Sequence, residues 1–181
     1  MRVLSALLVF SLIWVFSCEK QEKAPVAEVA PSPQEYFSNE NAPEIIRLKP
    51  QYEEEAGQWE AFSKLENGIA KFRITTEEEY GTGIDDLTQL EKNLSTSDYP
   101  EKFDIPAIKS RVLVLKTLLL QTQALLDKET VNNKPLTEAH TKIIAAFNAL
   151  KKQVAETLAS ADAEMLLKDI GQEDFLKEIE Q

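Results

Sequence analysis

The segment RVLVLKTLLLQTQALL, residues 111–126, decides the fold class of this chain. Its apolar side chains recur at steps of three and four, which is the spacing of a helix face. Asp104 is a candidate cap and Pro106 suits a first turn, so a helix is predicted from about residue 105 to Asp127. Because this helix is the most apolar one, we expect it to be central and covered on most sides.

The flanking segments have the same helical spacing, and no alternating run is long enough to predict a sheet. Before it, a long helix is predicted after Pro50, with its apolar face formed by Tyr52, Ala56, Trp59, Phe62, Leu65, Ile69 and Phe72. A shorter helix follows, with apolar residues at Ile84, Leu87, Leu90 and Leu94. After it, a third long helix has its apolar face formed by Ala139, Ile143, Ala146, Phe147, Leu150, Val154 and Leu158. A C-terminal stretch, interrupted at Gly171, carries Met165, Leu166, Ile170, Phe175, Leu176 and Ile179. We therefore predict an all-α, up-down helical bundle of three long helices and one short one, with a C-terminal helix packed alongside.

The amino terminus predicts export. An uncharged apolar run from Val3 to Phe16 follows Arg2. It is shorter than the roughly 20 residues that span a bilayer as a helix. A basic start and a short apolar run are typical of a secretory signal peptide.

The run ends at Val15-Phe16-Ser17-Cys18, and this sequence resembles the lipobox of bacterial lipoproteins. The resemblance implies cleavage between Ser17 and Cys18, with lipid on Cys18. Two or three acyl chains would hold the protein to a membrane, because a single chain binds only marginally. The alternatives are a buried cysteine, an intermolecular disulfide, or an ordinary signal peptide cleaved elsewhere.

Composition divides the chain into a signal peptide, residues 1–17, a Pro-rich lipid-anchored linker, residues 18–43, and a helical domain, residues 44–181. The chain has 20 basic and 31 acidic residues and a net charge of −11. This balance argues against nucleic acid as a partner, because phosphate contacts need clustered Lys and Arg.

Few residues are candidates for chemistry. One Cys and one His cannot form a zinc site, a catalytic triad would have to use the one His, and no cofactor motif occurs, so we expect no metal, no cofactor and no enzyme. His140 lies at the edge of an apolar stripe, where we favour a boundary histidine over a catalytic base. Arg111 projects to the side of Ile108 and Leu115, so it either forms a buried ion pair, extends its head group to solvent, or lines a ligand site.

The segment FDIPAIKSR, residues 103–111, running into the apolar helix, resembles small uncharacterised lipoproteins of Bacteroidota. The resemblance implies an outer-membrane lipoprotein that faces the periplasm or the cell surface, and it implies no activity. We expect a non-enzymatic interaction or structural module whose partners are the membrane, through the lipid, and an unknown envelope protein. The alternative is a periplasmic lipoprotein that binds a small ligand or a cation.

Overall fold

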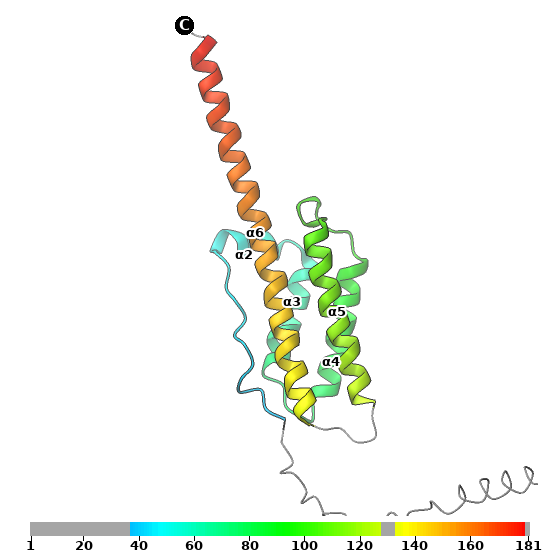
Figure 1. Ribbon diagram of the computed structural model, residues 1–181. Coiled ribbons are helices and arrows are strands. Elements are labelled where there is room, and N and C mark those ends of the chain that lie inside the picture. Colours follow the sequence, from blue (N-terminus) through cyan, green and yellow to red (C-terminus); the bar gives the residue numbers. More distant parts are fainter. Residues whose placement is uncertain (1–36, 128–132, 180–181) are drawn as a thin grey trace, which may run out of the picture. The chain divides into compact units, whose positions relative to one another are not determined.

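The computed structural model describes residues 37–127 and 133–179, with side chains as far as residue 168 (Figure 1). All regular structure in these ranges is helical, which confirms the predicted all-α class. The elements are α2 (Pro50–Gly57), α3 (Glu60–Arg73), α4 (Tyr80–Thr96), the 3-10 turn η2 (Glu101–Phe103), α5 (Pro106–Leu126) and α6 (Asn133–Ile179).

The helix predicted after Pro50 is two helices, because the chain breaks at Gln58 and Trp59. Trp59 takes a non-helical conformation, with φ −81° and ψ 88°. Its buried ring stacks on Phe62 and Phe103 at centroid distances of 5.5 and 5.3 Å. The break thus lets one large aromatic side chain fill the space beside η2, at the end of the core.

The predicted short helix is longer than expected, because α4 begins at Tyr80 and has 17 residues against 14 in α3. The buried Tyr80 ring lies 5.2 Å from Phe72, and its hydroxyl donates to the carbonyl of Leu136 at 3.1 Å. These contacts hold the first turn of α4 against α3 and α6.

The helices contact one another in the order of the chain: α3 with α4, α4 with α5, and α5 with α6, while α3 also contacts α6. Figure 1 shows these four helices side by side. Their inward side chains form one core, whose largest fully buried members include Phe62, Leu65, Ile84, Leu115, Leu119 and Phe147. Burial of these apolar side chains is the main stabilising contribution.

Residues 37–49 form an extended segment that is packed against the helices. Asn148 of α6 accepts from the Ile46 N–H at 3.1 Å and donates to the Glu44 carbonyl at 2.8 Å. Arg73 of α3 donates to the Pro43 carbonyl at 3.0 Å and pairs with the Glu44 carboxylate. Phe37 packs on the core, so the packed chain begins no later than this residue, ahead of the boundary predicted after Pro43.

The buried Lys151 ammonium joins α2, α3 and α6. Its side chain is 3% exposed and pairs with Glu53 at 2.9 Å and with Glu66. Burial raises the pKa of Glu53, but hydrogen bonds from the Leu48 N–H and from Lys151 outweigh it, so its pKa lies below the ordinary value. A buried ammonium needs such partners, because an unpaired charge in the core is strongly destabilising.

The predicted C-terminal helix is not a separate element packed alongside the others. α6 is one helix of 47 residues that runs through Gly171, and Figure 1 shows it continuing beyond the other helices. Leu158 is its last buried residue, and beyond it the described side chains are exposed or half-buried. We call residues 159–179 the α6 extension.

Candidate functional site

The outward side of α5 is apolar. Leu113 is 61% exposed, Leu120 is 49% exposed and Val114 is 48% exposed. These residues lie opposite the buried stripe of Ile108, Val112, Leu115, Leu119 and Thr122. We call Leu113, Val114 and Leu120, with the flanking Arg111 and Lys116, the α5 outer face.

The expectation that the most apolar helix is central is therefore wrong. Among the described helices, α5 packs mainly on α4 and α6, and these two neighbours cover only one side of it. Its buried stripe has the ordinary width of a surface helix. The surplus of apolar residues is on the opposite side, where no described element covers them.

The charges on α5 are all basic. The helix carries Lys109, Arg111 and Lys116 and no acidic residue. Lys109 pairs with Asp104 and lies over the Tyr99 ring, 5.6 Å from its centroid. In a chain of net charge −11, this helix is a local region of positive charge.

Of the three alternatives predicted for Arg111, its exposure fits the one in which the head group extends to solvent. It is exposed and has no ion pair or hydrogen bond with the described residues. By helical spacing Arg111 is adjacent to Leu115 and Thr122, at the edge of the buried stripe and near the start of the helix. It flanks the α5 outer face and lines neither of the two described grooves.

The α6 extension also exposes apolar side chains, with Met165 and Leu166 each 63% exposed and Leu167 69% exposed. By sequence, residues 159–179 carry six acidic residues, namely Asp162, Glu164, Asp169, Glu173, Asp174 and Glu178, against Lys168 and Lys177. The extension is therefore apolar and acidic, whereas the α5 outer face is apolar and basic.

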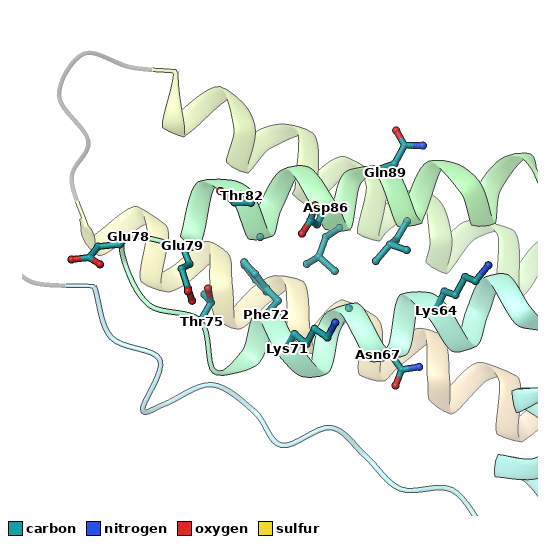
Figure 2. Close-up of a pocket in the computed structure, with 14 residues that line it drawn as sticks. Lys64, Asn67, Lys71, Phe72, Thr75, Glu78, Glu79, Thr82, Asp86 and Gln89 are labelled. Carbon is teal, nitrogen blue, oxygen red and sulfur yellow. The ribbon is translucent and has the colours of Figure 1, made fainter.

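A groove of about 710 Å³ lies between α3 and α4 (Figure 2). Two glycines line it and bring the helices close together. A Cβ on Gly68 would lie 2.5 Å from Leu90 Cδ1, and one on Gly83 would lie 2.9 Å from Phe72 Cδ2. Its apolar lining of Phe72, Leu87 and Leu90 could contact the body of a small molecule.

The groove has charges of both signs along its rim. Lys71 and Lys64 come from α3, while Glu79 and Asp86 lie on the opposite side, and Figure 2 shows them around the opening. Lys64 pairs with Glu60 on its own helix at 2.5 Å. Because both signs are present, the rim suits a ligand with both an anionic and a cationic group better than a free cation.

His140 is fully buried, and this differs from the boundary position that the sequence predicts. Its ring packs against Phe72 at 4.7 Å, Phe37 at 5.4 Å and Tyr80 at 5.9 Å between centroids. Its Nε2 is 3.2 Å from the Arg73 carbonyl, and Nδ1 has no partner. Burial lowers the pKa of His140 below its ordinary value. The histidine is part of the core and lines neither the groove nor the α5 outer face.

Ser17 and Cys18, the predicted cleavage and lipidation residues, lie outside the described residues. Within residues 37–127 and 133–168, no group of three His, Cys, Asp or Glu side chains is placed to hold a metal ion. None of the helices described there combines the length and the apolar content needed to cross a bilayer. Comparison of the chain with protein families, curated proteins and solved structures finds no match.

Proposed function

We propose that this chain is a lipid-anchored interaction module of the bacterial cell envelope, with an up-down helical bundle as its body and no enzymatic activity. The observation that supports interaction is the α5 outer face. Soluble monomers rarely leave large contiguous apolar patches in water, and such patches commonly mark binding surfaces. Three large aliphatic side chains, each about half exposed or more, form this face.

The proposed anchor is Cys18, after a signal peptide of residues 1–17. The lipobox resemblance and the position of the one cysteine in the chain support it. The linker would let the body stand away from the outer membrane, on its periplasmic side or at the cell surface. The body itself begins no later than Phe37, so up to about 18 residues separate it from the lipid and span at most about 60 Å.

The anchor is tested by replacing Cys18→Ser in the native host and labelling cells with palmitate. Label on the original chain and none on the variant is the expected result. Equal label on both chains overturns the anchor, and it leaves the interaction surface to be tested separately.

The interaction surface is tested with a photoreactive residue at Leu120 in intact cells. A defined cross-linked band is expected at Leu120, and none at Ile74, which is 69% exposed but lies at the end of α3. The band should disappear when Leu113→Asp is added, because a charge there disrupts the apolar face. Equal cross-linking at both positions contradicts the proposal.

A second candidate function is the binding of a small ligand in the groove between α3 and α4. The apolar floor and the rim of mixed charge support it. A thermal-shift screen of zwitterionic metabolites and divalent cations tests it. A stabilising compound should lose its effect with Lys71→Met and keep it with Lys142→Met, whose side chain is 62% exposed on α6.

A further inference from the structure

Two exposed apolar surfaces on this chain have opposite charge. At the start of the α6 extension, Asp162 accepts hydrogen bonds from Tyr52 and Gln51 of the same chain, while the apolar side chains Leu166 and Leu167 remain more than 60% exposed. The α5 outer face carries Arg111 and Lys116, with no acidic residue on its helix. The α6 extension carries six acidic residues and two basic ones. From this complementarity we infer that the α6 extension of one copy packs on the α5 outer face of a second copy. This inference rests on the proposed interaction function and names the partner as a second copy of the chain.

The apolar side chains of the extension favour such a partner. Leu166 and Leu167 lie on the side of α6 opposite its buried stripe, in line with Ala159 and Ala163. Nearer the body, that side of the helix is polar and carries Lys152 and Glu156, which pair with each other. By helical spacing, Met165 continues the line of the buried stripe, while Leu166 and Leu167 add apolar side chains on another side, and all three are exposed in the chain itself.

The extension cannot reach the α5 outer face of its own chain. α6 is continuous from Asn133 to Ile179, and the extension projects beyond the body (Figure 1). Folding back would break the helix and lose its backbone hydrogen bonds. A second copy is the one way in which this chain can bring its two surfaces together.

The two segments also match in length and direction. α5 has 21 residues and is about 31 Å long, and residues 159–179 form a helix of equal length. Figure 1 shows α5 beginning at the end of the body where α6 leaves it. Two copies placed end to end would therefore run each extension parallel to the partner's α5, starting from its first turn.

When residue 159 of the extension is aligned with residue 106 of the partner's α5, Leu166 lies beside the partner's Leu113 and Leu167 lies beside the partner's Val114. In this alignment, Glu164 lies to one side of these apolar contacts, on the same side as Lys116 of the other helix. This is the arrangement of flanking charges in parallel coiled coils, where such pairs set partner choice and orientation. A two-fold axis gives the contact twice and closes the assembly as a dimer.

The test is sedimentation equilibrium of the full-length chain in density-matched detergent at about 0.15 M salt. A reversible dimer is expected. Lys116→Glu and Glu164→Lys should each weaken it about tenfold, because each change places like charges at both copies of the contact. Ile74→Asp, at an exposed apolar residue outside the two surfaces, should leave the dissociation constant unchanged.

Mixing the two charge-reversal variants gives the sharper result. Lys116→Glu in one chain and Glu164→Lys in the other restore an opposite-charge pair at both contacts of the mixed dimer. The mixed dimer should therefore form about ten times more tightly than either variant dimer, with circular dichroism spectra unchanged. Recovery of this kind requires contact between copies, which a purely structural role of either residue would not give.

A monomer at every concentration overturns the inference, as does a dimer that responds to neither reversal. Weakening without recovery in the mixture also overturns it. Each of these outcomes leaves the cross-linking at Leu120 as a separate test of the interaction function. If Leu120 still cross-links in cells and the purified chain is monomeric, the α5 outer face binds another protein.

Discussion

The two parts of α6 have similar apolar content and different surroundings. From Leu136 to Leu158, the large apolar side chains face α3 and α5 and are buried. In the α6 extension, Met165, Leu166 and Leu167 are more than 60% exposed, although they are as apolar as the residues before them. Local sequence makes both parts helical, while tertiary contacts stabilise only the first.

This difference has consequences for stability. An isolated helix of about 20 residues is marginal in water, because nucleation is costly and packing supplies most of the stability of helices in proteins. The first part of α6 should therefore unfold with the whole body. In the monomer, the extension should open and close locally, at a much lower free energy.

The largest expected contrast is between Phe147→Ala and Leu167→Ala. Phe147 is fully buried and stacks on Phe62 at 5.8 Å, so its loss leaves a cavity and should cost about 3–5 kcal/mol of unfolding free energy. Leu167 is 69% exposed, so its truncation should change that free energy by less than about 0.5 kcal/mol. Urea unfolding, at a concentration where the chain is monomeric, measures both. Similar losses would contradict the division of α6 into two parts.

Two adjacent lysines on the first part of α6 provide the next contrast. Lys151→Met removes the cation between Glu53 and Glu66, whose side chains are 33% and 27% exposed. We expect a loss of about 2–3 kcal/mol, less than for a fully buried pair, because water partly solvates both carboxylates.

The matched control is Lys152→Met. The Lys152 side chain is 72% exposed and pairs with Glu156 at 3.7 Å on the same helix. Its loss should stay below about 0.5 kcal/mol in urea unfolding. Equal effects at both lysines would show that the buried ammonium contributes no more than a surface charge.

Sequence periodicity predicts the all-α class and most of the core well. Phe62, Leu65, Ile69 and Phe72 are buried in α3 as their spacing predicts. Such patterns succeed because an amphipathic helix has one apolar stripe, and that stripe faces the core.

Periodicity fails where the outcome depends on neighbours. The apolar content of α5 predicts a covered helix, but its coverage is decided by α4 and α6, and Leu113 and Leu120 remain exposed. The groove depends on the close approach of α3 and α4 at Gly68 and Gly83, which no local pattern specifies.

His140 makes stability depend on pH near neutrality. Burial lowers its pKa in the folded state, so below about pH 6.5 the unfolded chain binds a proton that the native chain does not bind. Stability should therefore fall as the pH drops from about 7 to 5, by at most about 1.4 kcal/mol per pH unit from this residue.

The comparison that isolates this contribution is His140→Gln, whose amide can still donate to the Arg73 carbonyl. Its unfolding free energy should be less dependent on pH over the same range, when both chains are followed by urea unfolding at several pH values. Parallel pH curves for the two chains would mean that the ring takes up its proton equally well in the folded state.

The smallest effect comes from a pair of glycine and alanine exchanges, one in each part of α6. Ala145 is exposed in the first part, so Ala145→Gly should lower the global unfolding free energy by about 0.5–1 kcal/mol through helix propensity. Gly171→Ala makes the reverse change in the extension. There the gain in helix propensity should stabilise only the extension, because we expect this segment to unfold locally, without the body. The global unfolding free energy of the monomer should then stay constant, while amide exchange around residue 171 slows by about fivefold. If Gly171→Ala instead raises the global unfolding free energy as much as Ala145→Gly lowers it, the extension unfolds together with the body. The exposed leucines of the extension would then belong to the cooperative fold, and they would not form a separate segment that a partner stabilises.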